Sequence, residues 1–319
     1  MTDINGPKVV VIGGGTGMPV LLRGLRKYPV NLSAIVTVAD DGGSTGRLRE
    51  DLAIPAPGDI RKVIASMSAV EPTLLKLFQY RFENGNGLSG HALGNLILAG
   101  MTSISGDFYK GIKEISRVFN VKGRIYPISN SNMYLKAEFE DGSVVRGESQ
   151  IPKVGKRIKR VFYDTDNVEP LPEAIRAIEQ AELIVIAPGS LYTSIMPNLI
   201  APKIQEALRK TKATSVYVCN IMTQHGETSH YKASDHIKAI HKHANQSFLD
   251  RIIVHNEEIS HGIIAEYEKE KAEPVLSDDE VIQQLGVEVV RGNIANLHED
   301  GTLKHNEHEI AKILNKLVQ

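Results

Sequence analysis

The chain has 319 residues, of which 42% are hydrophobic, enough to bury the core of one large α/β domain or of two ordinary ones. Its 37 basic residues almost balance its 38 acidic ones, so charge gives no reason to expect nucleic acid or an anionic membrane as partner. A single cysteine, Cys219, excludes an intramolecular disulfide. No apolar run approaches the ~20 residues that cross a bilayer, and Met1 to Lys8 does not resemble a signal peptide. We therefore expect a cytoplasmic protein.

The first predicted element is a buried strand that leads into a glycine-rich loop and a helix. Lys8 to Ile12 is an unbroken β-branched run, typical of a strand covered on both faces. The loop consists of Gly13, Gly14, Gly15, Thr16 and Gly17. Such glycines let the backbone approach a phosphate, whose charge the next helix dipole favours. The spacing is not G-x-G-x-x-G, and a tight turn with unusual backbone angles is the alternative.

A second strand, Leu32 to Ala39, completes a β-α-β unit and leads into a second loop. The loop contains Asp40, Asp41, Gly42, Gly43, Ser44 and Thr45, followed by Gly46 and Arg47. An acidic residue here can accept from a ribose hydroxyl, and two adjacent carboxylates can instead hold a divalent ion that bridges phosphates. Asp40 and Asp41 are thus candidate Mg²⁺ ligands, and Ser44, Thr45, the glycine amides and Arg47 are expected to form a second anion-binding surface. The alternative is a helix cap before a solvent-facing helix, on which Arg47, Arg49, Glu50 and Asp51 are exposed.

Two further motifs lie at predicted helix starts. Asp59, within Pro57-Gly-Asp-Ile-Arg61, is a candidate ligand-binding residue, and an ordinary helix cap is the alternative. His91 and Asn95, within Gly87-Leu-Ser-Gly-His-Ala-Leu-Gly-Asn95, can donate hydrogen bonds to a phosphate, and His91 can assist proton transfer. The candidate catalytic residues are therefore Asp40, Asp41 and His91. A histidine satisfied inside close helix packing is the competing interpretation of His91.

The stretch from Val121 to Asp164 differs from the rest, because apolar and charged residues alternate from Leu135 to Phe139 and Asp141-Gly142 is a strong hairpin turn. We expect a small antiparallel β excursion near residues 121–164. No repeat or long linker interrupts the chain, so residues 1–319 are predicted to form a single elaborated domain.

The same order of strand, loop and helix returns after Leu183 to Ala187. The loop offers hydroxyls and helix-start amides to an anion through Pro188, Gly189, Ser190, Thr193 and Ser194. Val216 to Cys219 and Arg251 to Val254 predict further strands, with Cys219 a buried small hydrophobe. Ser277-Asp-Asp-Glu280 predicts a capping box, and Gly286 ends that helix.

Together these elements predict an α/β protein with a doubly wound, mostly parallel, Rossmann-like sheet. Its glycine-rich loops then flank the switch point where such sheets bind ligands. The five basic residues between Lys153 and Arg160 are predicted to form a solvated rim and not a nucleic-acid patch. His241 and His243 point apart on a helix, so we expect no zinc site there.

Five ordered motifs resemble the gluconeogenesis factor family, also called YvcK-like, over most of the chain. They are Gly13 to Gly17, Asp40 to Ser44, Pro57-Gly-Asp59, His91-Ala-Leu-Gly-Asn95 and Pro188-Gly-Ser190. The wider superfamily includes 2-phospho-L-lactate transferase, the CofD-type enzyme of deazaflavin cofactor synthesis. The resemblance implies that Gly13 to Gly17 line the ligand's phosphates and that Asp40 and Asp41 sit at the metal or ribose position. It also implies that His91, Asn95, Ser190 and Thr193 close the pocket.

The resemblance implies a UDP-sugar-binding regulatory factor needed for gluconeogenic growth and normal cell shape. A regulatory protein partner that reads the bound state is left unidentified. The enzyme alternative is a CofD-like transferase that moves a phospholactyl group from a nucleotide diphosphate donor with Mg²⁺. A third alternative is an NAD-binding oxidoreductase. It is disfavoured because the first loop lacks the G-x-G-x-x-G spacing of dinucleotide-binding proteins. The residues leave the base and the sugar of the ligand open, and this class of fold commonly forms homo-oligomers.

Overall fold

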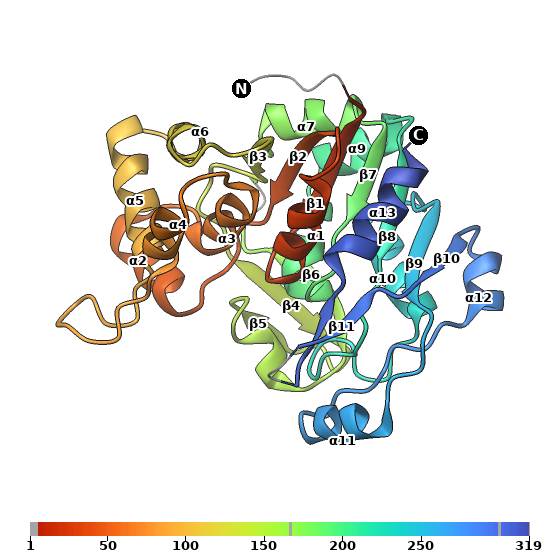
Figure 1. Ribbon diagram of the computed structural model, residues 1–319. Helices are drawn as coiled ribbons and strands as arrows, with labels where there is room; N and C mark the ends of the chain where they lie inside the picture. Colours follow the sequence, from red (N-terminus) through yellow and green to blue (C-terminus); the bar gives the residue numbers. More distant parts are fainter. Residues whose placement is uncertain (1–5, 166–167, 299–300, 319) are drawn as a thin grey trace.

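A computed structural model describes residues 6–165, 168–298 and 301–318; the N-terminal residues 1–5, where the sequence predicts no signal peptide, lie outside this part. Seven strands form the central sheet, and every neighbouring pair is parallel. In spatial order they are β10 (Glu288–Gly292), β9 (Arg251–His255), β8 (Thr214–Val218), β7 (Leu183–Ile186), β1 (Lys8–Gly13), β2 (Asn31–Val36) and β3 (Arg124–Pro127). The predicted Rossmann-like α/β fold is confirmed (Figure 1).

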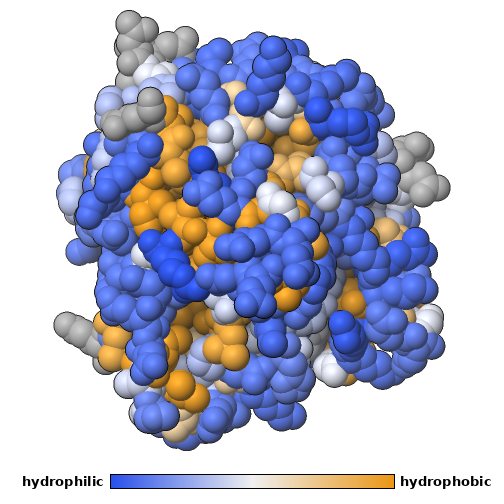
Figure 2. Space-filling view, turned by 90° about the vertical axis from the view of Figure 1, so that its right-hand side faces the viewer, coloured by the Kyte–Doolittle hydropathy of each residue, from blue (hydrophilic) through white to orange (hydrophobic). Residues whose placement is uncertain are grey.

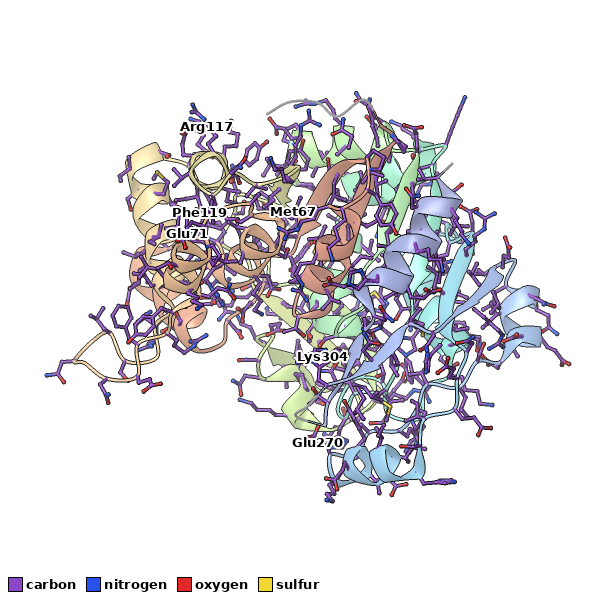
Figure 3. The ribbon with its side chains drawn as sticks, in the orientation of Figure 1. Met67, Glu71, Arg117, Phe119, Glu270 and Lys304 are labelled. Carbon is purple, nitrogen blue, oxygen red and sulfur yellow. The ribbon has the colours of Figure 1, made fainter. Side chains whose placement is uncertain are left out.

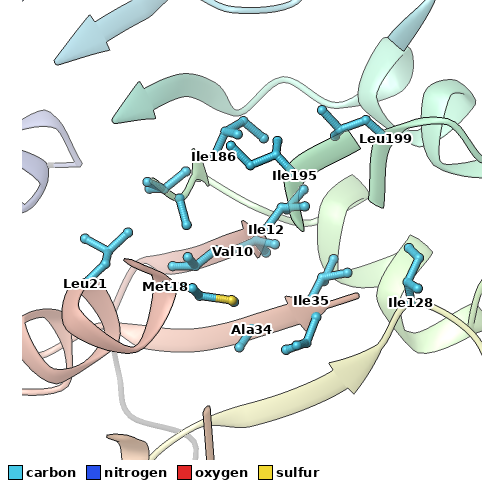
Figure 4. Close-up of a cluster of buried hydrophobic side chains, with 14 of the residues drawn as sticks. Val10, Ile12, Met18, Leu21, Ala34, Ile35, Ile128, Ile186, Ile195 and Leu199 are labelled. Atoms are coloured by element: carbon cyan, nitrogen blue, oxygen red, sulfur yellow. The ribbon is translucent and has the colours of Figure 1, made fainter. Parts of the chain in front are cut away.

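Helices cover both faces of the sheet, as the unbroken apolar strands require. One face carries α1 (Gly17–Leu25), α3 (Pro57–Met67) and α13 (Glu307–Leu317), as Figure 1 shows. The other carries α7 (Pro172–Glu179), α8 (Met196–Leu199), α9 (Pro202–Lys210) and α10 (Ala233–Ala244). In the core between these layers, Ile12 and Ile186 of adjacent strands lie close to Ile35 and Met18, all fully buried (Figure 4).

Four helices form a separate layer beyond the β3 edge of the sheet (Figure 1). They are α2 (Gly43–Leu52), α4 (Pro72–Gln79), α5 (Leu93–Ser105) and α6 (Phe108–Val118). The ring of Phe78 lies 4.3 Å, centroid to centroid, from that of Phe119, which joins α4 to the end of α6. Glu71 caps α4 by accepting from the N–H groups of Thr73 and Leu74 (Figure 3). This layer holds the starts of α2 and α5 close to the carboxyl ends of the strands.

The predicted antiparallel excursion exists, but it begins later than residue 121. Its three strands are ordered β5 (Val144–Arg146), β4 (Leu135–Phe139) and β6 (Ile158–Tyr163), with a 3₁₀ turn at Ile151–Val154. The first strand of the predicted range, β3, instead pairs parallel with β2 in the central sheet. Ile125, Tyr126 and Pro127 are all buried, so this strand lacks the alternation that marks the antiparallel sheet.

The C-terminal third adds α11 (His261–Lys269), α12 (Asp279–Gln284) and a hairpin of β11 (Ala295–Leu297) with β12 (Leu303–His305). The predicted capping box is wrong: Asp278 is the N-cap residue of α12, and the Ser277 hydroxyl bonds the Asp279 carboxylate instead of a backbone N–H. Gly286, at φ +78°, follows the helix as expected.

The outer surface of the C-terminal elements is mostly hydrophilic. Seen from the side of β10 and α12, apolar side chains appear in patches surrounded by polar groups (Figure 2). Within the described ranges, no helix is both long and apolar enough to cross a membrane.

Candidate functional site

The sheet reverses its order between β1 and β7, and the loops after these two strands meet at that point. A Cβ placed on Gly17 would lie 2.2 Å from the carbonyl oxygen of Pro188, so only glycine permits this approach. The Asn198 side-chain amide stabilises the contact between the two loops by donating to the carbonyl of Gly13, at 3.1 Å. In open α/β sheets, ligands bind outside the strand ends at such a switch point.

Asp59, near the start of α3, holds the first glycine loop in place through hydrogen bonds. Its Oδ2 accepts from the N–H of Gly15 at 2.7 Å, and its Oδ1 from Lys62 Nζ at 2.9 Å. Gly15 has φ +66°, and a Cβ on Gly14 would lie 2.5 Å from Thr37 Cγ2. Asp59 makes no side-chain cap for α3, so the alternative of an ordinary helix cap is wrong, and its carboxylate instead positions the first glycine loop.

The two adjacent aspartates of the second loop face different partners. Asp40 Oδ1 accepts from the N–H of Gly42 at 2.9 Å. A Cβ placed on Gly58 would lie only 2.6 Å from Asp40 Oδ2, so α3 packs closely against this carboxylate. Asp41 Oδ1 accepts from the N–H of Ser149 in the antiparallel excursion, at 2.9 Å. Burial, and then the nearby carboxylate of Asp59, raise the pKa of Asp40. Among the described residues, no group of three or more His, Cys, Asp or Glu side chains is arranged to hold a metal.

Glu148 is a site residue that the sequence analysis missed. The hydrogen bond from Ser149 to Asp41 holds its segment against the second loop. Burial, and then the carboxylates of Asp40 and Asp59, raise the pKa of Glu148 to about 8. The antiparallel excursion therefore places a carboxyl with a raised pKa near the second loop.

We expect Glu148→Gln to change how stability depends on pH. The folded state raises the pKa of Glu148 from 4.5 to about 8, so this group favours folding below about pH 4.5 and loses that contribution as pH rises through 8. The variant should gain stability relative to wild type in urea unfolding at about pH 9, and much less at about pH 5. Glu140→Gln, at an exposed carboxylate of the same excursion, is the control. Equal curves for wild type and Glu148→Gln would contradict the assignment.

Ser44, His91 and Asn95 form one hydrogen-bonded group between α2 and α5. Ser44 Oγ accepts from the N–H of Ala92 at 3.3 Å and from Asn95 Nδ2 at 3.1 Å, which leaves its own proton for His91 Nδ1, at 3.1 Å. His91 then carries its proton on Nε2, and burial followed by the nearby Arg47 charge lowers its pKa, so it is neutral. Internal partners occupy most of these groups, and among the described residues none accepts a hydrogen bond from the Nε2–H of His91.

Arg49 departs from the alternative in which α2 shows an exposed charged face, whereas Arg47, Glu50 and Asp51 are exposed as that alternative expects. Only 1% of Arg49 is exposed, and its guanidinium donates to the carbonyls of Ala39 at 3.0 Å and Asp40 at 2.7 Å. It also donates to Asn132 Oδ1 at 3.0 and 2.8 Å and lies 4.0 Å from the centre of the Tyr134 ring. One buried cation thus ties the end of the β2 segment to the segment that enters the excursion.

The second glycine loop is held by Asn220, another residue that the sequence analysis missed. Asn220 Oδ1 accepts from the N–H of Gly189 at 3.0 Å, and its Nδ2 donates to the Gly189 carbonyl at 2.8 Å. The next residues, Leu191–Ile195, form a single π-helical turn, a feature common at functional sites. Thr193, predicted to face the ligand, instead donates its hydroxyl to Glu227 at 2.8 Å. Ser194 does face the first loop, since its Oγ would lie 3.1 Å from a Cβ on Gly15.

A cavity of about 360 Å³ opens beside the junction of the two loops. Its walls come from both glycine loops, from the segment after β8, from α11 and from β12: Thr16, Gly17, Gly189, Ser190, Asn220, Ile221, Met222, Thr223, Gln224, Tyr267, Leu303 and His305. His305 donates from Nε2 to the carbonyl of Cys219 at 3.0 Å, and burial lowers its pKa to about 4, so it is neutral. Cys219 is buried, as expected. The volume is in the range of small-molecule sites.

Comparison with known proteins agrees with this architecture. Residues 9–295 match the family described as 2-phospho-L-lactate transferase CofD. A gluconeogenesis factor of Halalkalibacterium halodurans is 55% identical over 306 residues, covering 96% of this chain and 95% of that protein. A gluconeogenesis factor of Bacillus subtilis is 53% identical over 313 residues, covering 98% of each.

A solved structure supports the same relationship. A crystal structure of a protein from Bacillus halodurans superposes with a TM-score of 0.95 at 53% identity, covering 99% of this chain and 100% of that one. The chain belongs to the CofD family and, within it, to the group that contains the gluconeogenesis factors.

Proposed function

We propose that the protein is a regulatory factor that binds a UDP-sugar at the switch point, and that it acts in gluconeogenic growth and in cell-envelope and cell-shape maintenance. The relatives named gluconeogenesis factors support the metabolic part of this proposal. The ligand's phosphates lie against the two glycine loops, at Gly13 to Gly17 and Pro188 to Ser190, and its remaining parts occupy the adjoining cavity.

The observation that carries the proposal is the contact between the two loops. Gly17 and Pro188 approach so closely that a single Cβ would prevent it, and the cavity opens at this contact. Both loops lead into helical turns, whose N–H groups favour an anion. Two such loops from adjacent parallel strands place a pyrophosphate and its substituents in one crevice.

Asn220→Ala should weaken UDP-sugar binding by about tenfold or more in isothermal titration. The variant removes both hydrogen bonds that hold the Gly189 peptide, each worth about 1 kcal/mol, and it deletes a side chain that lines the cavity. Asn86→Ala, at an exposed position in the loop before α5, should leave the affinity unchanged. Unchanged affinity in Asn220→Ala would place the ligand elsewhere.

The second candidate function is a CofD-like transferase that uses Mg²⁺, the activity by which the matched family is described. Asp40, Asp59 and Glu148 lie close enough to interact electrostatically, and the adjacent carboxylates of Asp40 and Asp41 are the residues that would hold Mg²⁺ in such a transfer. Mg²⁺-dependent turnover of a nucleotide diphosphate donor would establish this function. Full turnover in Asp40→Asn and in Asp41→Asn would exclude a role for the aspartate pair.

A further inference from the structure

A cluster of positively charged and donor side chains lies where α2 and α5 begin, beside the segment that joins α4 to α5 and projects from the helical layer (Figure 1). Arg47 donates to the carbonyl of Ser89 at 2.7 Å, and Arg81 donates to the carbonyl of Gly90 at 2.6 Å. Both guanidinium groups therefore lie next to the backbone that leads into His91. We call Arg47, Arg61, Arg81 and His91 the arginine cluster; none of its members lines the cavity at the switch point.

Arg61 is the buried arginine of this cluster, with only 9% of it exposed. Its stem packs against the first turn of α5, because a Cβ on Gly94 would lie 2.8 Å from Arg61 Cδ. Its Nε donates to Asn95 Oδ1 at 3.0 Å, and no other described residue accepts from its guanidinium. Arg49, by contrast, donates from all three of its guanidinium nitrogens. The two outer nitrogens of Arg61 thus lack the acceptors that a buried guanidinium requires.

His91 supplies a second donor without an acceptor, although only 5% of this residue is exposed. Its Nδ1 accepts from Ser44 Oγ at 3.1 Å, which leaves the ring proton on Nε2. The same Ser44 Oγ accepts from Asn95 Nδ2 at 3.1 Å, so one chain of hydrogen bonds links His91 to Arg61. Two side chains that are nine-tenths buried therefore each keep an N–H that no described residue accepts.

The arginines of the cluster have no acidic partner within the described ranges. Arg47, Arg61 and Arg81 each make the single hydrogen bond given above, and none of them forms an ion pair. Burial, and then the charge of Arg81, lower the pKa of Arg61. Burial, and then the charge of Arg47, lower the pKa of His91, on which Arg81 also acts. Like charges are thus held together around two buried donors.

The nearest carboxylates do not neutralise this charge. Those that act on Arg61 belong to Asp59 and Asp40. Asp59 is already paired with Lys62 at 2.9 Å, and Asp40 accepts from the N–H of Gly42. Asp51, the acid that acts on His91, is exposed on α2. An anion from outside the chain would supply both the missing charge and the missing acceptors.

We propose that the arginine cluster binds the phosphate or carboxylate group of a small organic anion, on the outer nitrogens of Arg61 and the Nε2–H of His91, with Arg81 and Arg47 at the rim. A guanidinium matches either group through paired N–H donors. The starts of α2 and α5 favour the same charge. Because α2 begins at Gly43, the anion binds beside the second loop. This site is additional to the UDP-sugar site and does not rest on the proposed function.

The test is a set of isothermal titrations and thermal-shift measurements with inorganic phosphate and with malonate, each compared with chloride at equal ionic strength. We expect saturable binding of at least one probe, which raises the melting temperature beyond the effect of chloride. Arg61→Gln should weaken this binding by about tenfold or more, and Arg81→Gln by about threefold or more, because each removes a charged donor. Binding of phosphate alone or of malonate alone supports the proposal and identifies the group that the cluster takes.

Arg117→Gln is the matched control. Arg117 is an exposed arginine of α6 in the same helical layer, it is paired with Glu114 at 3.1 Å, and it points away from the layer (Figure 3). This variant should bind both probes like wild type. Arg81 is also exposed, so Arg81→Gln should keep the fold, and an unchanged melting temperature without probe verifies this. Arg81→Gln therefore tests the proposal even where Arg61→Gln does not fold.

Two results would overturn the proposal: no stabilisation beyond chloride by either probe, or equal affinity of the probe for wild type and Arg81→Gln. The second result includes phosphate that binds only on the glycine loops. A UDP-sugar titration of Arg81→Gln separates the two sites. Retained UDP-sugar binding with weakened anion binding is the expected combination, and loss of both would contradict a separate site.

Discussion

Gly17→Ala is expected to destabilise the protein by about 2–4 kcal/mol and to abolish binding at the switch point. The new Cβ would lie 2.2 Å from the Pro188 carbonyl oxygen and 2.8 Å from the carbonyl carbon, both backbone atoms. The two loops must then separate, which moves β1 against β7 or displaces the start of α1. Urea unfolding measures the stability, and isothermal titration with a UDP-sugar measures the binding.

The matched control for this change is Gly100→Ala. Gly100 lies inside α5, and a Cβ there would meet nothing within 4 Å. Because alanine favours a helix by up to about 1 kcal/mol relative to glycine, this variant should be slightly more stable than wild type. Similar stabilities for the two alanine variants would contradict the steric role of Gly17.

Arg49→Met should cost about 3–5 kcal/mol in urea unfolding, the range for breaking a buried charged network. Methionine fills similar space, but the carbonyls of Ala39 and Asp40 and the side-chain oxygen of Asn132 lose their donor. Arg49→Lys should also be destabilising, because one ammonium cannot reach all of these acceptors.

Arg47→Met is the control on the same helix. Arg47 is exposed and donates to the Ser89 carbonyl at 2.7 Å, so its loss should cost less than about 1 kcal/mol. If Arg49→Met were as mild as Arg47→Met, the buried guanidinium would not be what holds the second loop against the excursion.

The sequence was sufficient to predict five of the seven central strands, β1, β2, β7, β8 and β9, because the signal there is local, whereas β10 was not predicted. Runs such as Lys8 to Ile12 are buried on both faces, and the glycines that follow them mark strand ends. Strand β3 was missed because four residues, Arg124–Pro127, contain neither a long run nor an alternation. The alternative of an exposed Arg49 is wrong because a charged helical residue gives no local sign of a buried partner.

Most of the unforeseen site residues come from segments distant in sequence. Glu148 arrives on the antiparallel excursion, Asn220 on the loop after β8, and Tyr267 on α11. No spacing rule connects these positions with the glycine loops, so only the tertiary structure brings them together. Thr193 lies in the turn after the second loop, but its hydroxyl donates to Glu227, and no local sequence pattern indicates that Glu227 is buried.

The central claim is tested most directly by thermal shift with UDP-sugars, GDP, GTP and NAD(H), each with and without Mg²⁺. A ligand at roughly a hundredfold excess over its Kd stabilises the folded state by about 2.7 kcal/mol, which is readily measured. The proposed function predicts a shift with UDP-sugars that disappears in Asn220→Ala. A Mg²⁺-dependent shift confined to guanine nucleotides, or a shift with NAD(H) alone, would contradict it.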